Sequence, residues 1–383
     1  MKRSYIAKRF QRSGAGLSLD TEALAKYKDI IDLSIGDTDF TTDESIINAA
    51  FRDAKAGHTH YGDPKGDPEL IDAVCRAWEE DFGQRLPRDH VLVSASSCLG
   101  MALVMLAILD PGDEVIVFSP YFPMYREQIE LAGGVCVDVP TYASEDYAID
   151  EARLRAAITP RTKAIVFNNP TNPTGMGYDG KTLELLARVA QEHDLLIAAD
   201  EIYTTYLYEG DFRPIRTLPG MAERTITLNS FSKNFLMTGW RVGVIIAEPE
   251  LLAVMNRING SLIYSAPSVS QRAALQALAM RKEIREKYVT AYRDRIFYSA
   301  DRIEKIPYLS LVRPKGTFYL FPGVEKTGLD EKAFCKVLLD QAHVLVSPGT
   351  PFGVSAAGHF RIACTVGIDQ LKTAFDRMEK LSF

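Results

Sequence analysis

Disulfide chemistry, long apolar runs and a strong charge of one sign are all missing from this sequence. Five cysteines, without the CxxC spacing of metal sites, occur in 383 residues, which favours reduced thiols in a cytoplasmic protein. No apolar run of about 18 residues is present, and none follows the basic start at residues 1–9, so we expect neither a membrane span nor a signal peptide. The mild net charge of −6 predicts no nucleic-acid or membrane surface.

What is present is an alternation of short β-branched runs with helical stretches between residues 91 and 248. Near-continuous apolar runs of this length are typical of strands buried on both faces. The pattern predicts an α/β fold: a large domain with a mostly parallel seven-stranded sheet sandwiched by helices. The strands are expected at Val91–Ser94, Glu114–Phe118, Val135–Val139, Lys163–Phe167, Leu195–Ala199, Thr225–Leu228 and Val242–Ala247.

The remaining sequence predicts a smaller α+β domain. The stretch Leu251–Lys305 is mostly helical by its spacing of apolar residues. After it we expect the strands Leu309–Val312, Gly316–Phe321 and Phe360–Ala363 and the helices Glu331–Gln341 and Gln370–Leu381. We therefore divide the chain into a large domain, 40–275, and a small domain made of residues 1–39 together with 276–383.

Polar clusters follow the ends of five predicted strands. Ligands of open α/β sheets bind outside the carboxyl ends of the strands, so five clusters on that edge indicate one shared site. The clusters are Ser96–Cys98, Pro120–Phe122, Asn168–Gly175, Asp200–Tyr203 and Ser230–Lys233.

Lys233 and Arg241, which both follow the strand Thr225–Leu228, suggest the chemistry of this site. Lys233 lies where desolvation and neighbouring cations can lower its pKa, which makes its amine a usable nucleophile. Arg241, eight residues on, can return to the same site and bind a phosphate in a bidentate manner. A lysine and an arginine on a solvated loop are the alternative.

Asp200 ends an apolar strand, and a buried carboxylate needs a cationic partner or a metal. A protonated pyridine nitrogen would be such a partner, although Asp200 could instead be the N-cap of a helix. Asn172, fixed by the proline after it, could donate a hydrogen bond to a phenolate oxygen that Tyr203 also contacts. Phe122 is a core aromatic or a residue that stacks on a flat ring.

Two further features favour anionic ligands. Ser96, Ser97 and Cys98 open a helical stretch, whose backbone N–H groups and dipole can bind a phosphate. Arg361 lies in a short apolar strand and needs an anionic partner, either a substrate α-carboxylate or a structural salt bridge.

Taken together, these residues resemble a class I/II aminotransferase of pyridoxal-phosphate fold type I, the aspartate aminotransferase superfamily. The resemblance extends from Ile31 to the region of Arg361, and its motifs are specific in their order and spacing. The matching segments are Ile31–Phe40, Tyr61–Gly66, Leu109–Val115, Asn169–Gly175, Asp200–Tyr203, Ser232–Arg241 and Lys315–Tyr319.

The resemblance implies pyridoxal 5'-phosphate as the cofactor, with amino acids and 2-oxo acids as substrates in a ping-pong transamination. It implies that Lys233 is the Schiff-base lysine and the acid/base catalyst, that Asp200 pairs with the pyridine nitrogen and that Tyr203 contacts the ring oxygen. The other implied cofactor contacts are Asn172 at the ring oxygen, Phe122 on the ring, and Ser97, Cys98, Ser230 and Arg241 at the phosphate.

The resemblance also implies how substrate and subunits meet. Gly36, Asn172 and Arg361 would bind the substrate carboxylate. Tyr61 would reach the phosphate of the neighbouring subunit, which makes a homodimer the expected assembly. The sequence departs from many relatives at Ser96–Cys98, a change that keeps the backbone donors to the phosphate. The segment before Ile31 shows no family pattern, and because this region often helps to enclose the substrate side chain in relatives, the specificity stays open.

Other functions explain less of the sequence. Ser230-x-x-Lys233 followed by Lys326-Thr327-Gly328 has the order of serine β-lactamase motifs, but no S-D-N lies between them. His58 and His60 have no carboxylate or cysteine spacing to complete a metal site. A β-lyase that cleaves C–S bonds, or a ring-closing synthase on the same cofactor, remains the main alternative.

Overall fold

A seven-stranded sheet is the largest element of this computed structural model, which describes residues 5–7 and 27–383. The spatial order is β2-β8-β7-β6-β5-β3-β4, and every pair is parallel except those that β8 makes with β2 and β7. The strands are β2 (Val91–Ser94), β3 (Glu114–Ser119), β4 (Val135–Pro140), β5 (Thr162–Asn168), β6 (Leu196–Asp200), β7 (Thr225–Ser230) and β8 (Gly243–Ile246). The predicted α/β fold is confirmed, and each strand ends within two residues of its expected position.

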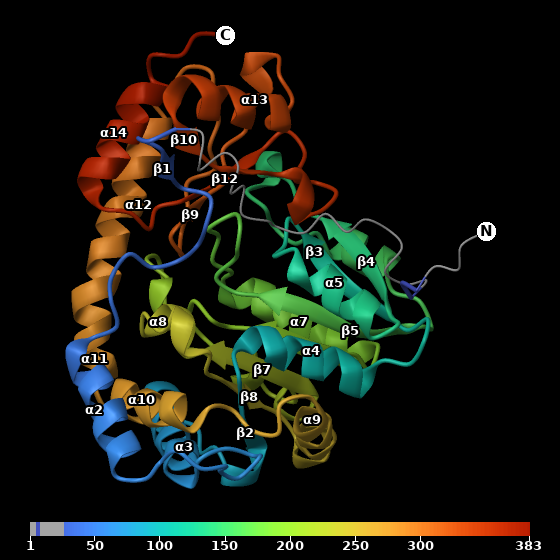
Figure 1. The fold of residues 1–383 in the computed structure, drawn as a ribbon. Coiled ribbons are helices and arrows are strands. Elements are labelled where there is room, and N and C mark those ends of the chain that lie inside the picture. The colour runs from blue at the N-terminus through green and yellow to red at the C-terminus, as the bar shows by residue number, and fades with distance from the viewer. Residues whose placement is uncertain (1–4, 8–26) are drawn as a thin grey trace.

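Helices cover both faces of this sheet (Figure 1). Val115 and Val117 of β3 pack on one face with α4 (Ser97–Ile108), α5 (Met124–Leu131) and α9 (Pro249–Leu262). Ile116 and Phe118 point to the other face, toward α6 (Glu151–Ala156) and α7 (Gly180–Glu192). Because side chains of a strand alternate between faces, burial on both explains the unbroken apolar runs.

Three helices pack beyond the β2 edge of the sheet. They are α2 (Glu44–Lys55), α3 (Pro68–Phe82) and α10 (Ser268–Ala279), and they share one apolar core with β2. From there a long helix runs along the side of the molecule (Figure 1). It consists of α11 (Arg281–Ile284), a π-helical turn at Arg285–Val289 and α12 (Thr290–Ile303).

The C-terminal residues form a second, smaller α+β unit with its own apolar core. β1 (Ile31–Asp32) pairs in parallel with β10 (Val344–Leu345), and β11, β12 and β9 form an antiparallel sheet. Those strands are β11 (Ser347–Pro348), β12 (Phe360–Ala363) and β9 (Tyr319–Leu320), flanked by the helices α13 (Glu331–Val337) and α14 (Ile368–Met378).

One predicted strand of this unit is wrong. Leu309–Val312 forms no strand, because only Ser310 makes a bridge, to Gly323, before Arg313 and Pro314 end the extended run. The expected strand Gly316–Phe321 shrinks to Tyr319–Leu320. The domain boundaries remain a prediction, which the separate core supports, and residues 1–4 and 8–26 of the predicted small domain lie outside the described residues.

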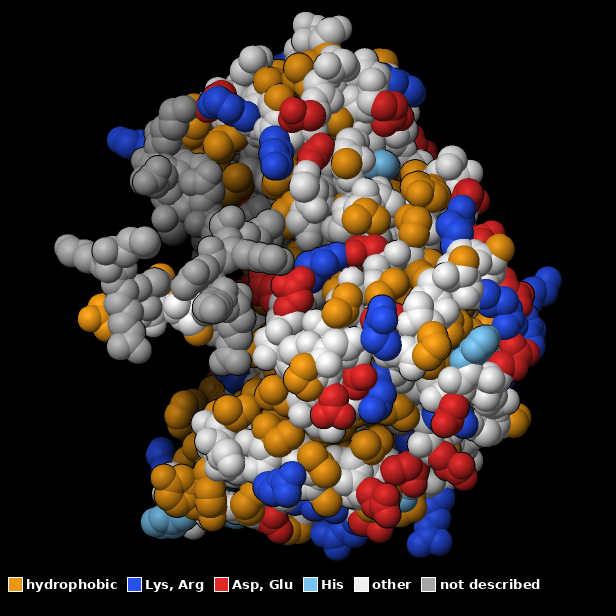
Figure 2. Space-filling model, turned by 90° about the vertical axis from the view of Figure 1, so that its right-hand side faces the viewer, with side chains coloured by type: hydrophobic (Ala, Val, Ile, Leu, Met, Phe, Trp, Pro, Cys, Tyr) orange, Lys and Arg blue, Asp and Glu red, His pale blue; other side chains and the backbone are white. Residues whose placement is uncertain are grey.

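Charged side chains of both signs are interspersed over the face that Figure 2 presents, and hydrophobic side chains gather at its lower left. Within the described residues, no helix has the length and apolar character needed to cross a membrane.

Candidate active site

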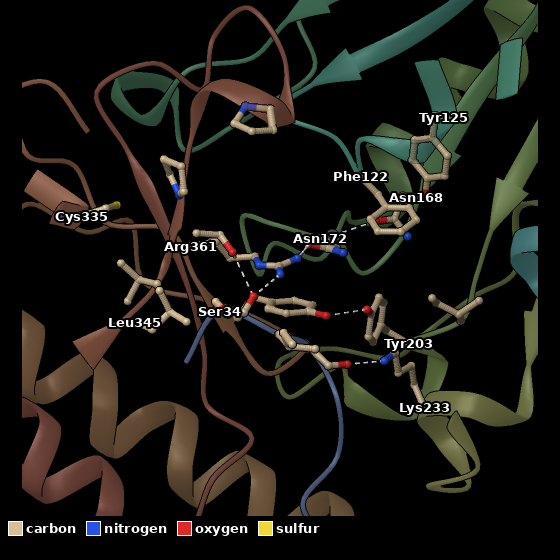
Figure 3. Close-up of a pocket in the computed structure, with 18 of the residues that line it drawn as sticks. Ser34, Phe122, Tyr125, Asn168, Asn172, Tyr203, Lys233, Cys335, Leu345 and Arg361 are labelled. Atoms are coloured by element: carbon tan, nitrogen blue, oxygen red, sulfur yellow. Dashed lines mark hydrogen bonds between the residues drawn. The ribbon is translucent and has the colours of Figure 1, made fainter. Parts of the chain in front are cut away.

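A cavity of about 1050 Å³ opens where the ends of β5 and β6 face β12 and the segment after β1 (Figure 3). Seven of the predicted site residues line it: Gly36, Phe122, Asn172, Asp200, Tyr203, Lys233 and Arg361. They come from both parts of the fold, so the cavity joins the large sheet to the smaller unit. The predicted edge of the sheet is therefore the place where these side chains meet.

Lys233 lies on the short helix α8 (Phe231–Asn234), directly after β7. The Ser230 hydroxyl caps this helix by accepting from the Ser232 N–H at 3.1 Å, which fixes the turn that aims Lys233 into the cavity. The Lys233 amine donates to the Gly36 carbonyl. Burial is the main reason that the pKa of Lys233 falls to about 8; the charge of Asp37 opposes this fall, and the charges of Arg361 and Arg241 contribute to it.

Asp200 ends β6 and is buried at the base of the cavity. The Tyr125 hydroxyl donates to its Oδ2 at 2.5 Å, and the Asn168 side chain donates to its backbone carbonyl at 2.9 Å. The other carboxylate oxygen, Oδ1, is buried and has no hydrogen-bond partner among the described residues. Burial raises the pKa of Asp200 to about 6, although the bond from Tyr125 lowers it.

Tyr203 and Asn172 occupy the middle of the cavity (Figure 3). The Tyr203 hydroxyl lies 3.1 Å from the Tyr319 hydroxyl. Asn172 is held by its backbone, whose N–H donates to Asn168 Oδ1 at 2.8 Å. Its own Oδ1 accepts from Arg361 at 3.0 Å, so its amide NH₂ group remains available to a ligand.

Arg361 comes from β12 and is 4% exposed. Its Nη1 donates to Asn172, and its Nη2 donates to the Ser34 carbonyl at 2.6 Å. Its Nε is buried without a hydrogen-bond partner in the part of the chain that the structure describes. The guanidinium also lies over the Tyr319 ring at 4.6 Å and the Phe352 ring at 5.0 Å.

Comparison with known proteins identifies the family. The model of aminotransferase class I and II matches residues 28–378. The chain belongs to the class I and II aminotransferase family. It is therefore a pyridoxal-phosphate-dependent aminotransferase, and a C–S lyase is not favoured.

Named relatives cover nearly the full length of this aminotransferase. It is 38% identical to the aspartate/prephenate aminotransferase of Thermus thermophilus, over 92% of this chain and 91% of that protein. It is 35% identical to the arginine–pyruvate transaminase of Pseudomonas aeruginosa, over 99% and 97%. A solved structure of Thermus thermophilus aspartate aminotransferase with maleate superimposes with a TM-score of 0.93 at 35% identity, over 99% and 100% of the two chains.

The residues of the cavity fit pyridoxal phosphate. The free Oδ1 of Asp200 is a buried acceptor that suits a protonated pyridine nitrogen. Phe122 lines the same cavity, 5.7 Å from the Tyr125 ring in an edge-on arrangement, so its ring is held in place beside Asp200. The lowered pKa of Lys233 suits an amine that must react with the cofactor aldehyde.

The residues predicted to bind the phosphate do not line this cavity but lie beside it. Ser97 and Cys98 begin α4, where the Ser96 hydroxyl caps Leu99 N–H at 3.3 Å. Ser230 is buried, and its hydroxyl donates to the Val242 carbonyl at 3.3 Å. Burial raises the pKa of Cys98, and the Arg241 charge opposes that rise just as it helps to lower the pKa of Lys233. The charge of the Arg241 guanidinium therefore acts on both groups.

Arg241 and Tyr61 are the predicted residues that reach outward. Arg241 has a left-handed backbone and donates to the Thr238 carbonyl at 2.7 Å. Tyr61 is 86% exposed and packs edge-on against Tyr264 at 4.9 Å. Tyr61 does not line this cavity.

Sequence reasoning gave no role to Tyr125 or Tyr319, and it named Asn168 only as the first residue of a polar cluster; all three line the cavity. Tyr125 is three residues after Phe122, a helical spacing that places both near the same end of β3. Tyr319 closes the matching segment Lys315–Tyr319, but a short strand alone does not show that its hydroxyl reaches Tyr203. Among the described residues, no group of three or more metal-ligating side chains is found.

Proposed function

We propose that this aminotransferase transfers an amino group from an L-amino acid to a 2-oxo acid with Lys233 as its proton-transfer group. The observation that supports this is the meeting of the Lys233 amine, the Asp200 carboxylate and the Arg361 guanidinium in one cavity. When bound, pyridoxal phosphate supplies an electron sink that stabilises negative charge at the substrate Cα. The remaining tasks fall to side chains of this chain.

Arg361 orients the substrate through its α-carboxylate. Its present partners at Nη1 and Nη2 are neutral oxygens of Asn172 and Ser34. A carboxylate can replace the Ser34 carbonyl and also accept from the free Nε, because the guanidinium matches a carboxylate in a bidentate manner. With the carboxylate fixed, the Cα–H bond can be turned toward Lys233.

Lys233 takes and returns the α-proton. A general base must be neutral, and a pKa of about 8 leaves about one amine in ten neutral at pH 7, far more than an exposed lysine has. The Gly36 carbonyl accepts from this amine and holds it in one orientation. Walls from both parts of the fold restrict water around it.

Asp200, Tyr203, Asn172 and Phe122 hold the cofactor ring. Asp200 would keep the pyridine nitrogen protonated through its free Oδ1, and Tyr203 and Asn172 would hydrogen-bond to the ring oxygen. The Phe122 ring would pack against the face of the cofactor.

The residues that would hold the phosphate lie beside the cavity rather than in its lining. The N–H groups of Ser97 and Cys98 at the start of α4, the Ser230 hydroxyl and Arg241 form the cradle. To reach the phosphate, Arg241 would give up its single hydrogen bond with the Thr238 carbonyl.

The working unit is a homodimer in which Tyr61 of each subunit completes the phosphate site of its partner. The support is a side chain that is 86% exposed, next to the exposed apolar residues Leu262, Ile263 and Tyr264. Lys233→Ala and Tyr61→Ala homodimers would each be impaired. Mixing the two unfolded proteins and refolding them should restore activity to about a quarter of the wild-type level, because mixed dimers contain one intact site. No recovery above the sum of the parents contradicts this arrangement.

Lys233 is tested most directly by Lys233→Ala, with Lys326→Ala as the matched control at an exposed lysine outside the cavity. The wild type and the control should be yellow with pyridoxal phosphate and should lose that colour when an amino-acid donor is added. The Lys233→Ala protein should hold no borohydride-reducible cofactor. A covalent adduct in that variant would show that another lysine carries the cofactor.

The donor is identified by a panel that includes the amino acids named for the relatives: aspartate, aromatic amino acids and arginine. Each is offered with 2-oxoglutarate and with pyruvate as acceptor, and the amino product is measured. Pyruvate release from cysteine conjugates without amine transfer would contradict transamination. We also propose a reducing, cytoplasmic location, since all five cysteines are free.

A further inference from the structure

Tyr319 contacts more of the site than any role assigned so far explains. It belongs to β9 in the smaller unit and is 2% exposed. Its hydroxyl lies 3.1 Å from the hydroxyl of Tyr203, which comes from the large sheet. A single buried side chain therefore joins the two halves of the cavity through one hydrogen bond.

The ring of Tyr319 makes a second contact, with the substrate side of the cavity. The Arg361 guanidinium lies over this ring at 4.6 Å, a distance at which a cation is attracted to an aromatic face. Phe352 lies near the same guanidinium at 5.0 Å. Neither ring takes up an N–H group of the guanidinium, so Nε stays free to donate to an anion.

The segment after β1 makes the third contact. A Cβ added to Gly36 would lie 1.8 Å from the Tyr319 hydroxyl oxygen, so the Gly36 backbone packs directly against that hydroxyl. The Gly36 carbonyl is the group that accepts from Lys233. Tyr319 thus touches the residues on both sides of the reacting centre.

We propose that Tyr319 is a positioning residue that orders Tyr203 on the cofactor through its hydroxyl and Arg361 on the substrate carboxylate through its ring. The proposal rests on the roles given above to Tyr203 and Arg361. The effect on Tyr203 and the effect on Arg361 can be tested separately, because the Tyr319 hydroxyl contacts the first and the Tyr319 ring contacts the second.

The direction of the Tyr319–Tyr203 hydrogen bond follows from the cofactor. Burial raises the pKa of both tyrosines, so both hydroxyls keep their protons. When Tyr203 donates to the ring oxygen, its own oxygen is free to accept, and Tyr319 must be the donor. Two hydrogen bonds in a chain strengthen each other, so Tyr319 increases the hydrogen bonding that the ring oxygen receives.

Tyr319→Phe removes the hydroxyl and keeps the ring. The measurement is the pH titration of the visible absorbance of the resting, cofactor-loaded protein. Weaker hydrogen bonding leaves more negative charge on the ring oxygen, so the nearby Lys233 nitrogen holds its proton to higher pH. We expect the midpoint to rise by about 0.3–1 pH unit, the equivalent of one neutral hydrogen bond. Binding of an unreactive α-methyl amino acid should change by less than about 2-fold.

Tyr319→Leu removes the ring as well. We expect the same rise of the titration midpoint, together with binding of the α-methyl amino acid that is about 3- to 10-fold weaker, because Arg361 loses one of its two aromatic neighbours. Tyr208→Phe is the matched control. It loses another tyrosine hydroxyl, one that donates to the Thr317 carbonyl at 2.7 Å outside the cavity, and should leave both measurements unchanged.

A double-mutant cycle separates positioning from a general effect on folding. In a Tyr203→Phe background, Tyr319→Phe should no longer shift the titration. A shift of equal size in both backgrounds overturns the hydroxyl role, and equal ligand binding by the Phe and Leu variants overturns the ring role. If Lys233→Ala keeps the wild-type absorbance, the proposed function fails instead, and the two failures are distinguishable.

Discussion

Asp200 should make the cofactor-free protein less stable as the pH rises from 4 to 7. Burial raises its pKa from 3.8 to about 6 in the folded protein, so the folded state holds this proton to higher pH than the unfolded chain. The stability that Asp200 contributes is therefore full below pH 3.8 and is lost as pH rises through the folded pKa. A difference of about two pKa units corresponds to a loss of about 3 kcal/mol.

The assay is urea unfolding of the cofactor-free wild type and of Asp200→Asn between pH 4 and 7.5. Asn has nearly the same shape but does not titrate, so the difference between the two free energies of unfolding isolates Asp200. That difference should fall by about 2.5 kcal/mol over this range, since a small part of the loss already lies below pH 4. In the loaded protein the fall should disappear, because a cationic nitrogen at Oδ1 lowers the pKa of the carboxyl.

Tyr125→Phe extends the same test. The Tyr125 hydroxyl donates to Asp200 at 2.5 Å, and a hydrogen bond to a charged group contributes about 1.5–3 kcal/mol. Without it the pKa of Asp200 should rise further and the loss of stability should continue above pH 7.

The reasoning would be refuted if the free energies of unfolding of the wild type and of Asp200→Asn differed by the same amount from pH 4 to 7.5. Asp200 would then ionise as it does in the unfolded chain.

Three further predictions concern the other side of the cavity. The rate at which cofactor-free protein recombines with pyridoxal phosphate should rise with pH around a midpoint near 8, because the neutral Lys233 amine reacts; stopped-flow absorbance measures this. Arg361→Lys should lower kcat/KM for amino acids by about 10- to 100-fold, because the bidentate bond is lost, and should hardly affect amines that lack a carboxylate. Gly36→Ala should retain the cofactor colour but lose at least about 10-fold in kcat/KM, because the new Cβ displaces Tyr319 or Lys233; a colourless variant would instead indicate loss of cofactor binding.

The sequence predicts the large sheet well because both faces of its strands are buried. Runs such as Val115–Phe118 are apolar at every position, since alternate side chains enter different cores. Five of the parallel runs end at a polar residue, namely Ser94, Ser119, Asn168, Asp200 and Ser230, and parallel strands bring those ends to one edge. This pattern is sufficient to place Asp200 and Lys233 in one site.

Contacts between distant segments cannot be predicted in the same way. The hydrogen bond of Tyr125 with Asp200 spans 75 residues, and that of Tyr203 with Tyr319 spans 116. No local pattern encodes such pairs, because they depend on how α5 and β9 pack against the sheet. At Leu309–Val312 the local pattern instead predicts a strand that does not form. The apolar residues suit a strand, but Ser310 is the only one of the four with a bridge partner in the described chain.

The pairing of the buried arginines supports one of the two partners that the sequence allowed for Arg361. Arg272 and Arg295 are each 9% exposed, and each forms ion pairs with carboxylates of the protein. The partners of Arg272 are Asp53, Asp67 and Glu69, and the partner of Arg295 is Asp39. Arg361 is more deeply buried, at 4%, yet its hydrogen bonds within the described residues go only to neutral oxygens. A buried cation without an anion is costly, and the open side of this one faces the cavity. An anion that enters the cavity, such as the carboxylate of a substrate, accounts for that cost, whereas a structural salt bridge does not.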